Sequence, residues 1–245
     1  MVKFVRFITV LVLFGSSSLH SEKAESISFD FRVFGIGKDN YEGLFYFNGS
    51  DFAPLQFHRT HRSVKKYSYR GTLPFGIFVR NPNHDPDEPN SAEFVRIAKS
   101  APILAKDQLI VLAADPNNRD SLDVQRRFML FHLDDSLDTF GRNTIVLLNA
   151  TGANLFGRVD GKDMSLPMGN SDPIPYKPTS GKSTTRIAFA LATKDGARLV
   201  MSNDLELSNN RRVIIILEPP RRENSFRVAV RVLSESIFPE EAEDN

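Results

Sequence analysis

The 245-residue sequence contains no cysteine and no tryptophan, and it has only five histidines. Without cysteine the chain forms no disulfide, no cysteine–zinc site and no iron–sulfur cluster, and it has no thiol nucleophile. A cysteine is also the point of lipid attachment after signal cleavage, so a lipoprotein is excluded. We therefore expect a fold held by its hydrophobic core, with neither a metal nor a cofactor.

The chain also lacks a strong net charge, because 31 Lys and Arg residues oppose 30 Asp and Glu residues. The formal charge of +1 argues against nucleic acid as a partner. Hydrophobic residues make up 41% of the chain and charged residues 25%, which excludes bulk disorder and is typical of a globular protein.

The N-terminal segment 1–21 is typical of a secretory signal peptide. Two basic residues precede an apolar run at 7–14, and small residues that predict cleavage after Ser18 or Ser21 follow it. The run is shorter than the roughly 20 residues of a membrane span, so no retained span is expected. Since the exported portion has no disulfide, we expect a periplasmic or extracellular protein of a bacterium.

Short strand-like runs dominate the rest of the chain, each rich in Val, Ile, Phe and Leu and bounded by turn residues. The predicted strands are 28–34, 43–48, 73–80, 94–98, 108–113, 127–133, 144–149, 154–159, 184–192, 205–207, 212–217 and 226–233. The solid apolar run 213–217 predicts a central strand buried on both faces, and the alternation in 226–233 predicts two distinct faces. No segment predicts a helix of three turns, although 121–127 could form one short turn.

Two pairs of segments repeat in the same order, about a hundred residues apart. The segment 96–116 corresponds to 199–219, since both contain an apolar strand, a polar turn, a second apolar strand and an acidic residue before proline. The segment 44–55 corresponds to 155–166 through a Leu-Phe start and an Asn-Gly or Asp-Gly turn.

The repeats predict an all-β fold with two tandem antiparallel β-sandwich domains, of an immunoglobulin-like or transthyretin-like type. We place the N-terminal sandwich at 26–118 and the C-terminal sandwich at 119–235. An acidic tail at 236–245 completes the chain.

Familiar catalytic and metal-binding spacings are missing. The segment 179–184 resembles the end of a phosphate-binding loop, but Tyr176 stands where that motif needs a glycine, so no nucleotide is expected. On a strand, His58 and His61 would point to opposite faces, which predicts two exposed histidines and no metal site. The acidic segment 115–123 lacks the spacing of a calcium loop. No catalytic residue is therefore predicted.

A basic stretch is the most distinctive local feature, because no carboxylate occurs between Asp51 and Asp85. Clustered cations beside aromatic faces can hold sulfated or carboxylated polymers. The residues predicted to bind an anionic partner are Arg59, Arg62, Lys65, Lys66, Tyr67, Tyr69 and Arg70. The alternative interpretation is a strand–loop–strand that simply exposes long polar side chains.

Three functional hypotheses follow. The first is an exported, non-enzymatic structural or adaptor protein of the bacterial cell envelope, which acts through contacts with another envelope protein. The alternative is a module that binds carbohydrate or another anion, such as an acidic polysaccharide, through the stretch 59–70. The third is a hydrolase of unfamiliar design, which requires a pocket where His132 or His58 meets a carboxylate.

Overall fold

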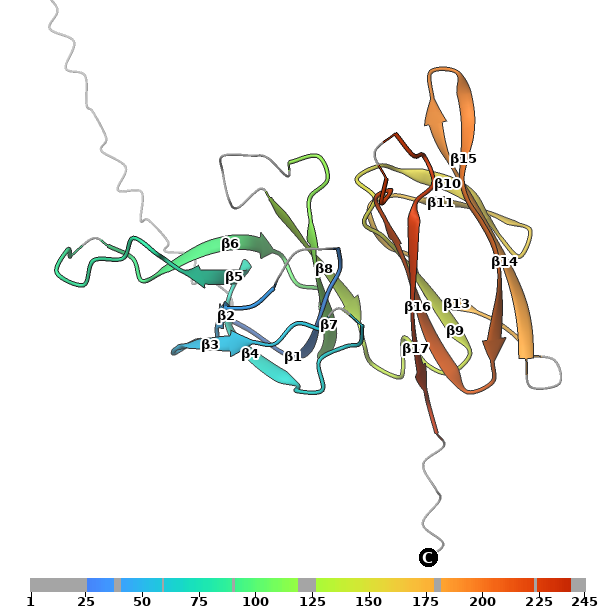
Figure 1. Ribbon diagram of the computed structural model, residues 1–245. Coiled ribbons are helices and arrows are strands. Elements are labelled where there is room, and N and C mark those ends of the chain that lie inside the picture. The colour runs from blue at the N-terminus through green and yellow to red at the C-terminus, as the bar shows by residue number, and fades with distance from the viewer. Residues whose placement is uncertain are drawn as a thin grey trace, which may run out of the picture.

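The computed structural model describes residues 26–37, 41–58, 60–89, 91–118, 127–178, 182–222 and 224–238. Within these ranges the chain has 17 strands in four sheets and no helix, which confirms the expected all-β class (Figure 1). The predicted signal peptide, most of the short turn at 121–127 and the end of the acidic tail lie outside the described residues.

The strands follow one another through two halves of the chain. The first half contains β1 (Ser26–Gly35), β2 (Leu44–Phe47), β3 (Phe52–Leu55), β4 (Tyr67–Thr72), β5 (Phe75–Arg80), β6 (Phe94–Ser100), β7 (Asp107–Ala114) and β8 (Phe128–Asp134). The second half contains β9 (Thr144–Asn149), β10 (Leu155–Val159), β11 (Lys162–Leu166), β12 (Gly169–Asn170), β13 (Ile174–Pro175), β14 (Lys182–Thr193), β15 (Gly196–Ser208), β16 (Arg211–Glu218) and β17 (Ala229–Ser236). All twelve predicted strands overlap strands of the structure.

The two halves have the same strand order. In the first half, sheet A has the order β4-β1-β7-β8 and sheet B the order β3-β2-β5-β6. In the second half, sheet C has the order β12-β9-β16-β17, with β13 also paired to β9, and sheet D has the order β11-β10-β14-β15. The two repeated segments therefore occupy equivalent places, as the hairpins β2–β3 and β10–β11 and as the strands β7 and β16.

Sheets A and C are mixed, which corrects the expectation of purely antiparallel sheets. In sheet A, β1 pairs with β7 in parallel, and in sheet C, β9 pairs with β16 in parallel. The remaining strand pairs of the described residues are antiparallel. In each parallel pair, the chain passes through the neighbouring sheet before it returns to the second strand. Such a crossover connection leaves no turn motif in the local sequence, so it was not predicted.

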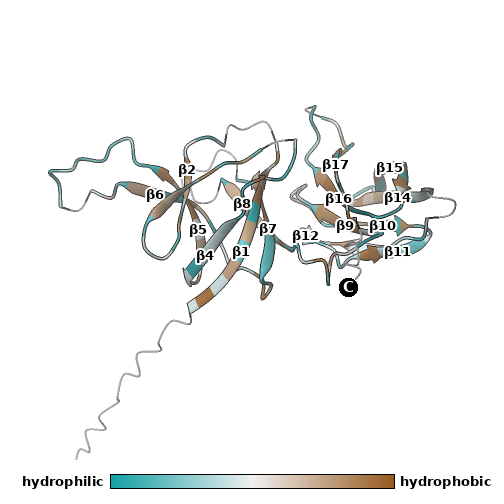
Figure 2. Cartoon of the chain, turned by 90° about the horizontal axis from the view of Figure 1, so that it is seen from below, coloured by the Kyte–Doolittle hydropathy of each residue, from teal (hydrophilic) through white to brown (hydrophobic). Residues whose placement is uncertain are grey.

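Turn residues behave as predicted in the hairpins. Asp160 and Gly161 have φ values of 50° and 78° between β10 and β11, as a tight two-residue hairpin requires. Gly49, Gly196 and Asn210 also have positive φ in their turns. The polar loop between β5 and β6 extends away from the sheets (Figures 1 and 2).

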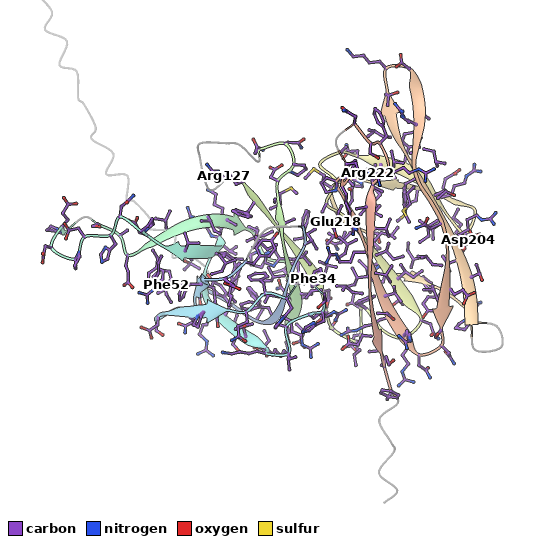
Figure 3. All side chains as sticks on the ribbon, viewed as in Figure 1. Phe34, Phe52, Arg127, Asp204, Glu218 and Arg222 are labelled. Carbon is purple, nitrogen blue, oxygen red and sulfur yellow. The ribbon has the colours of Figure 1, made fainter. Side chains whose placement is uncertain are left out.

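Three hydrophobic cores lie between successive sheets, in the order B, A, C, D. The first core lies between sheets B and A and contains Phe31 and Phe75. The central core lies between sheets A and C, where Leu109 and Ile214 are both fully buried. The third core lies between sheets C and D and includes Phe189. Figure 3 shows the label of Phe34, a central-core residue, between the two groups of strands.

β16 confirms the strand that was predicted to be buried on both faces. Ile214 and Ile216 point into the central core, whereas Val213, Ile215 and Leu217 point into the third core, and none is more than 1% exposed. The alternation predicted for 226–233 holds only in part. Figure 2 shows apolar stretches along both β16 and β17.

Val228, just before β17, and Val230 within it pack against the third core, whereas Leu233 lies in the central core. Val232, which was predicted to share the face of Val230, is instead 45% exposed. The buried part of that face therefore ends before the strand does.

Candidate functional site

The residues of the predicted anion-binding stretch are divided between surface and interior. Arg59 lies outside the described residues. Lys65, Lys66 and Arg70 are exposed, whereas the Arg62 side chain is only 10% exposed. The cations of this stretch therefore have different environments and different partners.

Tyr67 and Tyr69 point into the first core because they lie on alternate positions of β4. They are 3% and 5% exposed, and the Tyr67 ring stacks on Phe31 with a centroid distance of 5.4 Å. The Tyr67 hydroxyl accepts the backbone N–H of Gln56, and the Tyr69 hydroxyl donates to the carbonyl of Thr72. Neither ring offers a platform at the surface for a ligand.

Lys66 is paired with carboxylates from distant strands. Its Nζ contacts Asp107 of β7 closely and lies 3.6 Å from Asp30 of β1. The hydrogen bond to Asp107 raises the pKa of Lys66, and the charges of both carboxylates raise it further. Because these carboxylates come from other strands, the sequence between Asp51 and Asp85 gives no sign of them.

A group of charged side chains closes one end of the central core. Four chain segments each carry a charged residue two positions away from a residue of the central core. Because side chains two positions apart on a strand point the same way, each charged side chain lies on the same face as that core residue. These neighbours are Arg32 beside Phe34, Asp135 beside Leu133, Arg212 beside Ile214 and Glu235 beside Leu233. Together with Arg62 they form what we call the central ion cluster.

Ser63 holds the loop that brings Arg62 to this cluster. It is only 2% exposed, its backbone N–H donates to the carbonyl of Val33, and its hydroxyl oxygen accepts the N–H of Val33. A further bond from the hydroxyl to the carbonyl of Lys65 fixes the loop locally. The loop is therefore fastened to β1 beside the position of Arg32.

Arg62 and Arg212 share the same two carboxylates. Arg62 Nη1 donates to Asp135 Oδ1 at 2.6 Å and to Glu235 Oε2 at 3.1 Å. Arg212 Nη2 lies 2.7 Å from Glu235 Oε2, and Arg212 Nε donates to the same oxygen at 2.8 Å. Its Nη1 donates to the carbonyls of Asp135 and Phe140. The cluster thus connects the β3–β4 loop and β8 of one half to β16 and β17 of the other.

Positive charge is in excess within the cluster, since three guanidinium groups face two carboxylates. Burial is the main cause that lowers the pKa of Arg62, and nearby Arg212 and Arg32 lower it further against the opposing effect of the carboxylates. Burial raises the pKa of Glu235, but the charges of Arg62 and the other arginines outweigh it, so that this pKa is lowered overall. Arg62 Nη2 is buried and has no hydrogen-bond partner.

Sequence reasoning selected Arg62 but missed the rest of the cluster. The available signal was the period of two, because each charged residue continues a buried apolar face by one more inward position. This pattern predicts buried charged residues only once it is known that both faces of β16 and β17 pack against other sheets.

A second feature is the outer face of sheet B, which carries five phenylalanines that belong to none of the three cores. We call this group the phenylalanine face; it consists of Phe45, Phe47, Phe52, Phe78 and Phe94. Phe52 stacks on Phe94 with a centroid distance of 4.0 Å and also contacts Phe47 and Phe78.

The phenylalanine face remains accessible. Phe47 is 38% exposed, and the other four side chains are partly exposed. Arg80 borders the face, with its guanidinium carbon 5.8 Å from the ring centroids of Phe45 and Phe94. Figure 3 shows Phe52 on the side of the first half that is remote from the second half.

Ser100, His132 and Gln108 form a hydrogen-bonded chain at the edge of the first core. Gln108 Nε2 donates to two backbone carbonyls, so its Oε1 accepts a hydrogen bond from His132 Nδ1–H at 2.8 Å. The Ser100 hydroxyl then donates to His132 Nε2 at 2.6 Å. Burial lowers the pKa of His132 to about 4, so the ring is neutral and weakly basic at pH 7. Because neither partner is a carboxylate, His132 gives the hydrolase hypothesis no support.

In the parts that the structure describes, the other sequence motifs show no assembled site. The rings of His58 and His61 stack at 4.4 Å, with His61 exposed and His58 partly buried. Asp115 accepts hydrogen bonds from Asn117 and Asn118, as in a polar turn. Residues 179–181 of the segment 179–184 lie outside the described residues, as do Asp120 and Asp123, and the remaining three begin β14. Where the structure is described, no group of three or more His, Asp or Glu residues is arranged to hold a metal ion.

Comparison with known proteins identifies no relative: no family model matches the chain, and no curated protein matches it. Within the described ranges, no helix combines the length and the apolar character that crossing a membrane demands. The apolar run at 7–14 belongs to the residues outside those ranges.

Proposed function

We propose that this chain is an exported, non-enzymatic adaptor that holds a partner protein of the bacterial cell envelope. In this proposal its two tandem β-sandwich units, immunoglobulin-like or transthyretin-like in type, form one rigid support. The phenylalanine face of sheet B is the contact surface. The equal strand order of the two halves and the matching positions of the two sequence repeats support the tandem units.

Rigidity follows from the central core. An adaptor transmits position or force best when its units do not move relative to one another, and domains joined only by a small polar interface move by default. Here the interface between the halves is a continuous buried core that includes Leu109, Val111, Leu148, Ile214 and Ile216. Such an interface resembles the inside of a domain more than a transient contact.

The single observation that carries the adaptor role is the phenylalanine face. A connected group of partly exposed phenylalanines is an unusual surface for a protein without a partner, because exposed apolar patches favour association. The pairing of aromatic rings with an arginine at the border, Arg80, is typical of residues that dominate protein interfaces. A sheet face covered by phenylalanine therefore fits a protein partner better than a small polar ligand.

A co-purification experiment with a matched control tests the role. The tagged full chain is expressed with its leader in the source cell, and envelope proteins retained at high salt are identified. We expect one partner to be retained by the wild type and by Phe156→Ser on the outer face of sheet D, but lost with Phe47→Ser plus Phe52→Ser. High salt weakens charge-based contacts and leaves apolar contacts intact. Equal retention by all three chains, or turnover of a substrate panel by the purified protein, would refute the proposal.

The second candidate function, binding of carbohydrate or another anion by the stretch 59–70, is favoured by one observation. Arg62 of this stretch is buried in a cluster with excess positive charge and has a nitrogen without a partner. The proposed binding surface is therefore reduced from the seven predicted residues to the surroundings of Arg62.

A further inference from the structure

We propose that the central ion cluster is a binding site for a single oxyanion group, a carboxylate, sulfate or phosphate, held between Arg32 and Arg62. The site deepens the anion-binding candidate and is independent of the adaptor role. Its ligand is a small acidic molecule, and an acidic monosaccharide and a free inorganic anion are the two sources of the required group.

A cavity lies beside the cluster and gives access to it. It has a volume of about 500 Å³ and is bounded by the β3–β4 loop on one side and β17 on the other. Arg32, Arg62 and Glu235 line it, together with the polar side chains Thr60, His61, Ser63 and Ser234. Glu235 is the one carboxylate among the lining residues, and its charge is already opposed by Arg62 and Arg212. Ligand pockets for small molecules are typically about 300–1,000 Å³, so this cavity has room for a monosaccharide acid.

The arginines of the cluster differ in how many of their donors are already used. Arg212 directs every guanidinium nitrogen to an acceptor, either a carboxylate or a backbone carbonyl. Arg62 uses Nη1 for both carboxylates and leaves Nη2 buried without a partner. Arg62, which lines the cavity, therefore keeps an unused donor, whereas Arg212 keeps none.

Arg32 is the second arginine with capacity for a ligand. Its Nη1 lies 3.7 Å from Asp135 and 3.9 Å from Glu235, beyond hydrogen-bonding distance. Its side chain is 34% exposed, so an entering anion can reach it directly. Arg32 and Arg62 together therefore provide two guanidinium groups for one ligand.

The charge balance of the site selects the sign of the ligand. Among the described residues of the cluster, three arginines face two carboxylates, and one further negative charge balances them. Buried polar groups in proteins almost always find a hydrogen-bond partner, and a buried guanidinium N–H without one calls for an acceptor. Arginine presents a planar fork of donors that matches the paired oxygens of carboxylate, sulfate and phosphate.

Arg62 Nη2 lies beneath the surface, so full engagement needs a small displacement of the loop residues beside it. Thr60, His61 and Val64 are exposed and belong to this loop, whereas Ser63 is fastened to β1. We therefore expect the anion to bind first at Arg32 and the loop to adjust around it.

Calorimetric titration of the full chain tests the site at constant ionic strength, with inorganic phosphate, sulfate, glucuronate and chloride as probes. We expect at least one of the first three to bind more than tenfold more tightly than chloride. Tighter binding of glucuronate identifies an acidic sugar as the source, and tighter binding of phosphate or sulfate identifies a free anion. If none of the three binds better than chloride, the proposal is overturned.

Two substitutions localise the binding. Arg32→Gln removes the exposed donor group and should weaken binding at least tenfold, whereas Arg70→Gln, an exposed cation of the same stretch, should leave it unchanged. Arg32→Lys keeps the charge but loses the planar fork, so it should bind with intermediate affinity. Wild-type affinity in Arg32→Gln would overturn the site. Partner retention through the phenylalanine face should be unaffected by Arg32→Gln, which separates this proposal from the adaptor role.

Discussion

Truncation of Ile214 should destabilise both halves of the molecule and not only the half that contains it. Ile214 lies on β16 in the second half, is fully buried and faces sheet A across the central core. Removing most of such a side chain typically costs about 2–5 kcal/mol, from lost burial and from the cavity left behind. We expect a loss of about 3 kcal/mol in the free energy of unfolding for Ile214→Ala.

Tyrosine fluorescence reports on the first half almost alone. Of the five tyrosines, Tyr41, Tyr46, Tyr67 and Tyr69 belong to the first core and only Tyr176 belongs to the third. In a Tyr176→Phe background, fluorescence follows the first half while circular dichroism follows all strands. For a urea dependence of about 3 kcal/mol per molar, the expected loss lowers both midpoints by about 1 M.

The control is Leu104→Ala, whose side chain is fully exposed and should leave both midpoints unchanged. If Ile214→Ala shifts the circular-dichroism transition while the tyrosine transition stays in place, the halves unfold independently. That result would refute the coupling of the two halves by the central core, and with it the rigid support on which the adaptor proposal relies.

Three further predictions concern single residues, and a fourth concerns the N-terminus. The pKa of His132 is about 4 in the folded protein, below its unfolded value of about 6.5, so the unfolded chain binds the proton first as the pH falls. The free energy of unfolding should therefore drop by about 3 kcal/mol between pH 6.5 and pH 4. In denaturation curves, His132→Gln should abolish this part of the pH dependence. Asp135→Asn leaves two buried arginines with one carboxylate and should cost about 3–5 kcal/mol by the same measurement. Gly157→Ala would place a methyl group 1.9 Å from the Ala188 carbonyl oxygen on β14 and should cost about 1–3 kcal/mol, seen as a lowered melting temperature. N-terminal sequencing of exported protein should begin after Ser18 or Ser21, and an intact N-terminus would contradict the signal-peptide interpretation.

The strands that were predicted best from the sequence are those whose burial requires apolar side chains at every position. The run at 213–217 is apolar at every position because β16 lies between two cores. β4 was missed because serine and arginine alternate with its tyrosines, so its apolar content is low even though its pattern has a period of two. β15 was predicted only at 205–207 but extends over Gly196–Ser208, since most of its side chains are exposed and polar.

The candidate site was harder to predict than the fold for a physical reason. Each member of the central ion cluster comes from a different segment, and Arg62 meets Asp135 and Glu235 across 73 and 173 residues of sequence. Local composition therefore indicated a basic stretch without carboxylates, whereas the tertiary structure pairs both Lys66 and Arg62 with carboxylates from other segments. Charge runs can be evaluated only after the sheets that face them are known.

Ion pairs between the two halves give the apolar contacts of the central core a defined register. Arg212 of β16 lies 3.3 Å from Asp135, which follows β8, and Arg62 donates to both Asp135 and Glu235 of β17. Two apolar sheets can shift against each other with little change in buried area, whereas a shift that separates a buried carboxylate from its arginine leaves an uncompensated charge. We infer that Asp135 and Arg212, which pair across the halves, contribute more to the fixed orientation of the two halves than to their affinity for each other. The same geometry leaves Arg62 and Arg32, which both line the cavity, with donors that the two carboxylates do not use, so the proposed anion site would follow from how the halves are joined.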